Sequence, residues 1–419
     1  MREDGGPILP PADLEVVLPY GESARVTLEA QSDLALLDVH FSIDTTGSFR
    51  DEIETLKRDL TASIVPALRR RVDDVAVGVS RMEDFPRLPF GESSDRPFKL
   101  VTAITTSLAR VDSAVASLDM PLGSGGDGPE AGAEALYQIA TGEGFSGALI
   151  SPWSGVPASG GGTRAGVGFR DGALAVVVHV TDAPTHTPED YAGSYIGTHS
   201  LTNAIDALRA EGIYVVGIAS GDDGRGYLEE VAIGTGAVQD PVDDACGTGI
   251  GGRARLPVSG VCPLVFDVAG DGTGLSSSLV DAIIRLLDTV RIHEAFGVAT
   301  DDPFHFVTTV EAVSATPPSG FDAPERADRR PSDDGILDTF TEVPTGTAMH
   351  FDALLTNSLI EPTDYDQSFR ITVTIRGDAL TLARRVIRVR VPAVHASIDA
   401  SLDASQLDAG LADAANGDL

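Results

Sequence analysis

The sequence predicts a doubly wound α/β domain with a mostly parallel sheet, inserted in a discontinuous antiparallel β-sandwich. Between residues 37 and 295, valine-rich apolar runs alternate with amphipathic stretches. Segments in which polar and apolar residues alternate occur both before this region, in 11–36, and after it, in 303–392. Because period-two segments lie on both sides of one α/β region, we expect that region to be inserted into a loop of the sandwich.

Near-continuous apolar runs are predicted to be buried strands, because a parallel sheet is covered by helices on both faces. In chain order they are LDVHFSI, VAVGVSRM, LAVVVHVT, IYVVGIA and PLVFDVA. The amphipathic stretches between and after them are predicted to be helices: 51–71, 108–119, 130–141, 199–211, 225–233 and 276–291. Ligands of such domains bind outside the carboxyl ends of the strands, so that edge is where we look for a site.

The flanks supply the predicted sandwich strands, including ESARVTLEA, AMHFDALL, SFRITVTI and ARRVIRVRV. Residues 151–168 are rich in Gly, Ser and Pro and are expected to form a surface excursion. The predicted domains are an N-terminal sandwich part (1–36), the α/β domain (37–298), a C-terminal sandwich part (299–393) and an Ala/Asp low-complexity tail (394–419).

The chain of 419 residues carries a net charge of −33, from 63 acidic and 30 basic side chains. Such a field repels nucleic acids and anionic membrane surfaces and attracts divalent cations. No apolar run is long enough to span a membrane. We expect an extracellular or cell-surface protein, with a periplasmic location as the alternative, whose signal and anchor lie outside this segment.

Cys246 and Cys262 are the only cysteines, and they bracket the glycine-rich arm GTGIGGRARLPVSGV. Without a nearby His pair or a second Cys pair, a structural zinc site is not expected. A disulfide closing this loop would stabilise the fold by about 3 kcal/mol and would indicate an oxidising compartment. Two free buried thiols are the alternative.

The stretch IDTTGSFRDEIETLK (43–57) places Asp44 at the end of a buried strand and Thr46 and Ser48 on the loop before a helix. An aspartate followed at alternate positions by two hydroxyl side chains supplies hard oxygen ligands, which suit Mg²⁺ or Ca²⁺. The alternative is an ordinary helix start, with Ser48 as the N-cap and Asp51 and Glu52 near the positive helix end.

Three further acidic clusters follow predicted strands or begin predicted helices. RMEDFP contributes Glu83 and Asp84, GGDGPEAG contributes Asp127 and Glu130, and VVVHVTDAPTH contributes Asp182. Each alone could serve as a cap or a partner of the helix dipole. Together they place carboxylates from four junctions at one sheet edge, where like charges repel unless a cation lies among them. The sequence therefore predicts a metal site at this edge.

These motifs resemble the von Willebrand factor A-type domain, whose first metal motif is D-x-[ST]-x-S. The two acids after Ser48 in SFRDE, together with MEDFP, GDGPEAG and GFRDGALAVVVHVTDAPTH, are similar to segments of the integrin βI domain. In integrin β subunits the βI domain is inserted in a β-sandwich hybrid domain, so the resemblance extends to the flanks. The lysine-poor composition favours a prokaryotic relative.

The resemblance implies three neighbouring metal sites. The metal-ion-dependent adhesion site (MIDAS) would hold Mg²⁺ or Mn²⁺ through Asp44, Thr46, Ser48, Glu130 and Asp182. The adjacent site would hold Ca²⁺ through Ser48, Asp51 and Glu52. The third site, a second candidate for Ca²⁺, would use Asp84, Asp127, the Pro129 carbonyl and Glu130. Neutral hydroxyls leave the MIDAS ion under-neutralised, so an acidic side chain of a partner can complete its coordination.

The sequence departs from the integrin pattern at two places near these sites. Gly125 stands where the family has an asparagine ligand of the third site, and LPFGESSDRPF is much shorter than the family's cysteine-bounded specificity loop. A protein partner that presents a carboxylate is therefore expected without an animal-type ligand being implied. An α-subunit-like partner is a further candidate.

The function predicted on these grounds is a metal-dependent ligand-binding or adhesion module with no enzymatic activity. One alternative is a scaffold or assembly module whose metal is structural. Another is a Mg²⁺-dependent phosphohydrolase with Asp44 as nucleophile, although Thr46 occupies the position where that chemistry needs a second aspartate. His179 is expected to be a core histidine, and His186 either orients a ligand or bonds locally.

The tripeptide Arg376-Gly377-Asp378 spells RGD, a sequence that some integrins recognise in their ligands. It joins ITVTI to ALTLARRVIRV, where a Gly-Asp pair suits a hairpin turn. A turn is therefore predicted, with a recognition role as the alternative.

Overall fold

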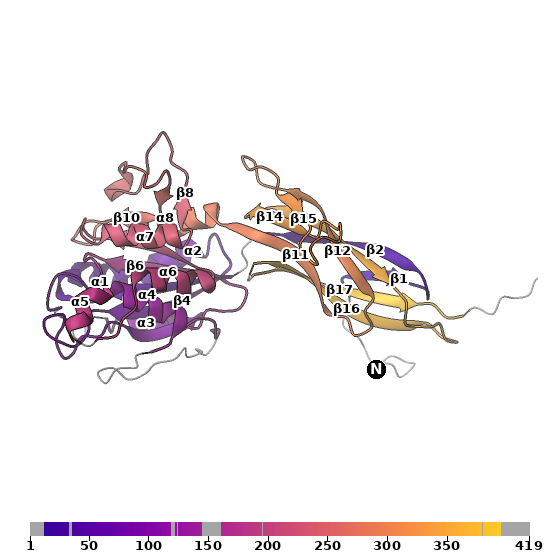
Figure 1. Ribbon diagram of the computed structural model, residues 1–419, viewed down its shortest axis with the longest axis horizontal. Helices are drawn as coiled ribbons and strands as arrows, with labels where there is room; N and C mark the ends of the chain where they lie inside the picture. Colours follow the sequence, from indigo (N-terminus) through magenta and orange to yellow (C-terminus); the bar gives the residue numbers. More distant parts are fainter. Residues whose placement is uncertain are drawn as a thin grey trace, which may run out of the picture.

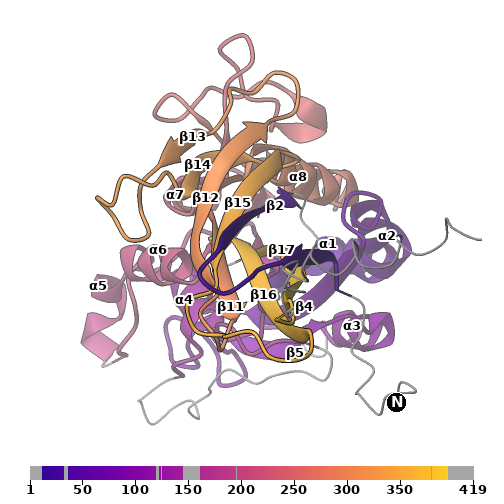
Figure 2. The same cartoon turned by 90° about the vertical axis from the view of Figure 1, so that its right-hand side faces the viewer.

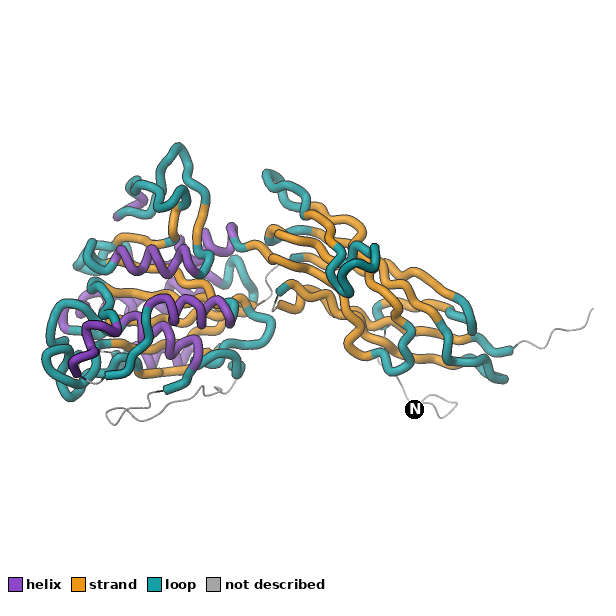
Figure 3. Tube along the Cα trace, viewed as in Figure 1, coloured by secondary structure: helices purple, strands orange, loops and turns teal. Residues whose placement is uncertain are grey.

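The computed structural model describes residues 12–32, 36–118, 122–123, 125–144, 161–194, 196–378 and 380–394. Two parts lie end to end along the long axis, and helices occur in only one of them (Figures 1 and 3). Most of the predicted excursion at 151–168 and all but one residue of the predicted tail at 394–419 lie outside the described residues. Within the described ranges, no helix combines the length and the apolarity that crossing a lipid bilayer requires.

The helical part is built on a six-stranded sheet, and the prediction of a mostly parallel α/β fold is confirmed. Its strand order is β10 (Val265–Asp267), β7 (Ile213–Ala219), β6 (Leu174–Thr181), β3 (Leu36–Asp44), β4 (Asp74–Met82) and β5 (Lys99–Thr105). All neighbours pair in parallel except β5, which is antiparallel to β4. Every residue of β6 is buried, as expected for a central strand covered on both faces.

Helices cover both faces of this sheet. The described helices are α1 (Arg50–Asp59), α2 (Val65–Leu68), α3 (Leu108–Val115), α4 (Gly132–Thr141), α5 (Pro188–Tyr191), α6 (Leu201–Ala210), α7 (Arg225–Gly234) and α8 (Leu275–Thr289). Figure 2 shows α4 and α6 on one side of the sheet and α1, α2 and α3 on the other. The predicted single helix over 51–71 is wrong in detail, because a π-helical turn at Leu60–Ile64 interrupts it just before Pro66.

The second part consists of two packed sheets. One has the order β1 (Leu14–Val17), β17 (Leu380–Val391), β16 (Gln367–Gly377), β11 (Arg291–Asp301), β14 (Thr339–Pro344) and β13 (Glu325–Ala327). The other has the order β12 (Val307–Thr316), β15 (Ala348–Thr356) and β2 (Ser23–Gln31). Apolar residues from both sheets, including Leu28, Phe340, Phe351 and Ile371, form one buried cluster between them.

Strands that precede the α/β region pair with strands that follow it. β2 is antiparallel to β15, whereas β1 is parallel to β17, with Leu14 opposite Ile387. The expectation of a wholly antiparallel sandwich is therefore wrong for β1. A short connection over 18–22 carries the chain from β1 in one sheet to β2 in the other, so β1 is not the hairpin partner of its neighbour in sequence.

A single residue connects the last helix of the α/β part to the sandwich. α8 ends at Thr289 and β11 begins at Arg291, so only Val290 lies between them. The Val290 amide donates to the Leu286 carbonyl at 2.8 Å, and its carbonyl accepts from Thr345 Oγ1 at 3.0 Å. The helix terminus is thus hydrogen-bonded to the sandwich, which leaves little slack in this connection.

The RGD tripeptide lies in the hairpin between β16 and β17, as predicted. Asp378 adopts a left-handed conformation with φ of 51°. Its carboxylate accepts from the amides of His293 and Glu294, each at 3.0 Å, and its own amide donates to the Glu294 carbonyl at 3.0 Å. The aspartate carboxylate is thus used to fasten the hairpin to β11.

Cys246 and Cys262 form a disulfide at the base of an arm that projects beside α7 and α8 (Figure 1). Both cysteines are buried, and the short strands β8 (Val238–Gln239) and β9 (Cys262–Pro263) pair next to them. Ile250 and Leu256 expose their side chains on the arm. The disulfide therefore closes a loop whose outer part makes little core of its own.

Removing this disulfide is expected to lower the free energy of unfolding by about 3 kcal/mol, because the bond closes a loop with a sequence separation of 16 residues. Urea titration of a Cys246→Ser/Cys262→Ser variant measures the loss, and wild-type protein in reductant should show the same decrease. An unchanged midpoint in both would contradict the stabilising role.

Asp378→Ala is expected to destabilise the fold by about 1 kcal/mol, because two amides lose their acceptor and Ala is disfavoured at positive φ. Arg376→Ala, at an exposed neighbouring position, serves as the matched control and should change stability little. Thermal denaturation of both variants separates these outcomes, and equal melting temperatures would argue against the fastening role.

Candidate metal centre

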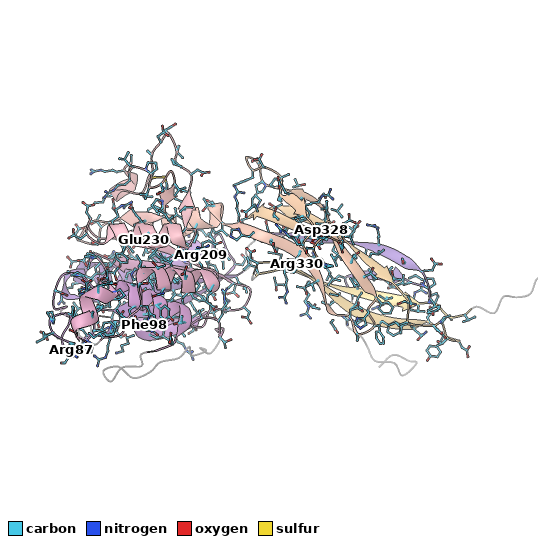
Figure 4. The ribbon with its side chains drawn as sticks, viewed as in Figure 1. Arg87, Phe98, Arg209, Glu230, Asp328 and Arg330 are labelled. Carbon is cyan, nitrogen blue, oxygen red and sulfur yellow. A yellow bond between two sulfur atoms is a disulfide. The ribbon has the colours of Figure 1, made fainter. Side chains whose placement is uncertain are left out.

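The predicted site residues lie at the carboxyl edge of the α/β sheet, where Asp44 ends β3, Asp51 and Glu52 lie in the first turn of α1, and the others occupy loops. The Gly123 amide donates to the Thr45 carbonyl, and the Glu130 amide donates to the Pro184 carbonyl, both at 2.9 Å. These bonds join the loop before α4 to the loops that follow β3 and β6. Arg87, three residues after Asp84, lies at the end of the α/β part farthest from the sandwich (Figure 4). The site therefore lies at that distal end.

Asp44 is fully buried and held by hydroxyl groups on both sides. Its Oδ1 accepts from the Thr46 amide at 3.0 Å and from Thr46 Oγ1 at 2.7 Å, and its Oδ2 accepts from Thr181 Oγ1 at 2.7 Å. Ser48 Oγ lies 3.3 Å from Thr46 Oγ1. Three oxygen-bearing side chains of the D-x-T-x-S motif thus gather at one point.

The helix-cap alternative for this motif is only partly borne out. The short 3₁₀ turn Gly47–Phe49 and the helix α1 both begin without a side-chain capping hydrogen bond, so Ser48 does not act as an N-cap. Asp51 and Glu52 do lie in the first turn of α1. They are therefore placed to interact with the positive end of that helix, independently of any metal.

Burial raises the pKa of Asp44 to about 6, although hydrogen bonds from Thr46 oppose the shift and the negative charge of Asp182 adds to it. Asp182 is half-buried at the end of β6. A charged Asp44 is thus costly in the metal-free protein and would be favoured by a nearby cation.

The acidic residues predicted for the adjacent site, Asp51 and Glu52, differ in burial. Asp51 is exposed, while Glu52 is buried and its Oε1 accepts a hydrogen bond from Ser220 Oγ. Glu52 Oε2 has no hydrogen-bond partner. Burial raises the pKa of Glu52, and the charges of Asp182 and Asp51 act in the same direction. Glu52 therefore faces the side of Asp182, which sequence spacing alone did not indicate.

Glu130 is a buried carboxyl group that lacks a full set of hydrogen-bond partners. Its side chain is buried, and Oε2 has no hydrogen-bond partner. Burial raises its pKa to about 10, and the neighbouring charges of Asp44, Asp84 and Asp95 add to the effect. The carboxylate is charged at neutral pH only if a cation compensates it.

Two buried carboxylates near Glu130 were not among the predicted ligands. Glu83 is paired with Arg81 and also accepts from Thr45 Oγ1 at 2.5 Å, so it has partners within the protein. Asp95 is fully buried and its Oδ1 has no partner. No strand end or spacing marks Asp95 in the sequence, because it lies inside the loop between β4 and β5 and reaches the site only through the path of that loop.

Asp84, Asp127 and His186 offer ligand atoms that all lie within 4.8 Å of one another. His186 Nε2 is 3.1 Å from Asp127 Oδ1 and 3.2 Å from Asp84 Oδ2. Burial alone would lower the pKa of His186, but the two carboxylates outweigh it and raise the pKa to about 9. His186, which was predicted only to orient a ligand or bond locally, thus lies close to Asp84 and Asp127 of the predicted third site, while Glu130 is not part of this trio.

Two further residues singled out in the sequence are Pro129 and His179. Pro129 is half-buried beside Glu130 in the chain. His179 is fully buried, burial lowers its pKa to about 3, and its Nε2 lies 3.0 Å from Tyr227 Oη. The expectation of a core histidine is confirmed.

The chemistry of the region fits a divalent cation. Buried carboxylates outnumber the cationic side chains beside them, which include Arg81 and His186. Oxygen atoms of Glu52, Asp95 and Glu130 are buried without any hydrogen-bond partner. Unpaired buried carboxylate oxygens are costly unless a cation or water meets them, and hard oxygen donors suit Mg²⁺, Mn²⁺ or Ca²⁺.

No family model and no curated protein matches this chain. Among solved structures it is similar to "von Willebrand factor type A from Catenulispora acidiphila", with a TM-score of 0.36, 14% identity and coverage of 89% of this chain and 74% of that one. It is similar to proximal thread matrix protein 1 from the mussel byssus (TM-score 0.34, 14% identity, coverage 65% and 51%). It is also similar to the pilus adhesin SpaC from Lactobacillus rhamnosus GG, with a TM-score of 0.34, 13% identity and coverage of 90% of this chain and 46% of that one. Similarities this low assign no family and no activity.

Mg²⁺ binding is expected to release protons at neutral pH, because ligation needs charged carboxylates and the pKa of Glu130 in the metal-free protein is about 10. Affinity should rise with pH from near the Asp44 pKa of about 6 upward. Calorimetric titrations in buffers with different ionisation heats measure the released protons. Glu130→Gln should reduce the release, whereas heats that do not depend on the buffer would contradict the shifted carboxylates.

The raised pKa of Glu130 also predicts how the stability of the metal-free protein depends on pH. Glu130 has a pKa near 4.5 when unfolded and about 10 when folded, so the folded state holds the proton more tightly. Stability without metal should therefore fall as pH rises from the unfolded value of 4.5 towards the folded value of about 10, and Mg²⁺ should restore it. Urea midpoints measured across this range with and without EDTA check the sign.

Proposed function

We propose that this chain is an integrin-β-like, metal-dependent adhesion module that binds an acidic residue of a protein partner through a MIDAS cation. The observation that carries the proposal is the buried Asp44, hydrogen-bonded on both oxygens by hydroxyl side chains and adjacent to Ser48. Mg²⁺ or Mn²⁺ is the proposed ion, held by Asp44, Thr46 and Ser48 with Glu130 and Asp182 nearby. Ca²⁺ is proposed for the adjacent site of Ser48, Asp51 and Glu52.

The residues themselves explain why an outside carboxylate would be needed. Thr46 Oγ1 donates its proton to Asp44, so its lone pairs are free to face a cation, and Ser48 Oγ lies beside it. Hydroxyl ligands carry no charge, so a dication bound here would keep part of its positive charge. An acidic side chain of a partner would supply the missing negative charge and fill an open coordination position.

We propose that residues 37–298 form the ligand-binding domain and that 1–36 and 299–393 form one hybrid-like sandwich around it. The pairing of β1 with β17 and of β2 with β15 supports this division. The disulfide supports an oxidising, extracellular or cell-surface location. An α-subunit-like chain is a further candidate partner, and no catalytic step is proposed.

The test uses an array of short peptides that each carry a single Asp or Glu, with matched Asn or Gln versions. Binding to acidic members only, in Mg²⁺ or Mn²⁺ and not in EDTA, is expected. Asp44→Ala should abolish it. Thr181→Ala, which removes one hydrogen bond to Asp44, should weaken it by about 10–100-fold.

Asp364→Ala is the control, because this exposed aspartate lies in the sandwich. It should bind as the wild type does. Peptides bound equally in EDTA would favour a scaffold module with a structural metal. Hydrolysis of a phosphate ester that disappears in Asp44→Asn would favour the phosphohydrolase alternative instead.

A further inference from the structure

We propose that Asp84, Asp127 and His186 form a mixed nitrogen–oxygen site for a transition-metal dication such as Zn²⁺ or Mn²⁺ in preference to Ca²⁺. The site lies next to the MIDAS residues but differs from them in ligand chemistry. It does not depend on the adhesion proposal, because its ligands are not those that would hold a partner's carboxylate. It assigns to His186 the role of a metal ligand.

The spacing of the three ligand atoms suits one small ion. Atoms bound at about 2.1 Å to a tetrahedral or octahedral ion lie about 3.0–3.4 Å apart. His186 Nε2 is 3.1 Å from Asp127 Oδ1 and 3.2 Å from Asp84 Oδ2. The ligands come from three separate loops, after β4, before α4 and after β6. Three separate loops thus bring their ligand atoms to one point, whereas a run of acidic residues on a single loop would not by itself form a site.

The Asp84 carboxylate is set with one oxygen toward the site. Its Oδ1 accepts from Tyr191 Oη and from the Phe85 amide, both at 2.5 Å. Its Oδ2 is fully buried and has no well-directed hydrogen bond, although His186 Nε2 is nearby. Oδ2 thus meets the His186 ring in an ion pair without a directed hydrogen bond, a position from which it could ligate an ion.

His186 has an outer carboxylate on its second nitrogen. Nδ1 lies 3.4 Å from Asp190 Oδ2 without forming a directed hydrogen bond, and Asp190 is fixed by the amide and hydroxyl of Thr187 at 2.7 and 3.0 Å. A carboxylate behind a histidine holds the ring orientation and favours a proton on Nδ1. Nε2, which is hydrogen-bonded to Asp127 in the metal-free protein, would give up its proton to bind a metal. The four-residue segment Pro188–Tyr191 therefore supplies both Asp190 and the Tyr191 hydroxyl.

Aromatic side chains wall the site and restrict water. Phe90 packs edge-on against the His186 ring at a centroid distance of 5.2 Å, and Tyr191 lies 4.8 Å from the same ring. Phe85, Phe90 and Tyr191 belong to one small buried cluster. Asp127 is about one-third exposed, so the site opens to solvent on its side. An ion could therefore reach the three ligands from the side of Asp127, while the aromatic rings cover His186.

The ligand set discriminates against Ca²⁺. Calcium takes about six to eight oxygen ligands, whereas imidazole nitrogen favours zinc and other transition ions. Gly125 contributes no side chain here, and a Cβ at that position would lie 2.7 Å from Glu130 Oε1. Position 125 therefore adds no oxygen ligand for Ca²⁺, because glycine has no side chain and Glu130 occupies the space beside it.

The test measures metal retention by the full chain. Protein stripped with EDTA is dialysed against an equimolar mixture of Zn²⁺, Mn²⁺, Ca²⁺ and Mg²⁺, and bound ions are counted by mass spectrometry. Wild type should retain about one transition ion per chain in addition to any Mg²⁺. His186→Ala and Asp127→Asn should each lose that ion, and pulsed EPR of the Mn²⁺ form should show a coordinated nitrogen in wild type only.

Matched variants keep the result interpretable. Asp127→Asn changes a partly exposed residue, so it tests the site even if His186→Ala fails to fold. Asp190→Asn should weaken retention by about 10–100-fold without removing a ligand. Asp44→Ala should keep the transition ion while losing Mg²⁺-dependent peptide binding, so the two proposals can fail separately. Retention of Ca²⁺ alone, or equal transition-ion content in wild type and His186→Ala, would overturn the assignment.

Discussion

The central constraint in this molecule is the burial of several carboxylates together at one end of a parallel sheet. Parallel strands bring their carboxyl ends to the same edge, so acidic residues that are distant in sequence converge there. Arg81 and His186 neutralise part of this charge. Asp95 Oδ1 and Glu130 Oε2 have no hydrogen-bond partner. Local geometry, raised carboxylate pKa values and the proposed need for cations all follow from this excess of buried negative charge.

Two neighbouring groups of side chains respond to that constraint with different chemistry. Around Asp44 the partners are hydroxyl groups, which add donors and lone pairs without adding charge. Around Asp84 the partner is an imidazole, supported by a phenol hydroxyl and walled by aromatic rings. The first group is suited to a hard ion that shares its charge with an outside ligand. The second is suited to an ion that stays within the protein.

The sequence predicted the central strands and Asp44 correctly because burial on both faces leaves an uninterrupted apolar run, and the end of such a run marks the ligand edge. It did not predict β5, whose outer residues are partly exposed and whose pairing with β4 shifts register. Asp95 and the position of His186 between two carboxylates were also missed. Those contacts depend on how loops fold back over the sheet, which residue spacing does not encode.

The one-residue connection at Val290 also has a mechanical consequence. β11 pairs on one side with β14 and on the other with β16, so it sits inside its sheet and not at an edge. A tensile force applied to the sandwich would be transmitted along β11 to α8. The connection between them would extend very little, because it consists of Val290 alone. The force would therefore be transmitted to the α/β part through α8, which packs against the sheet of that part.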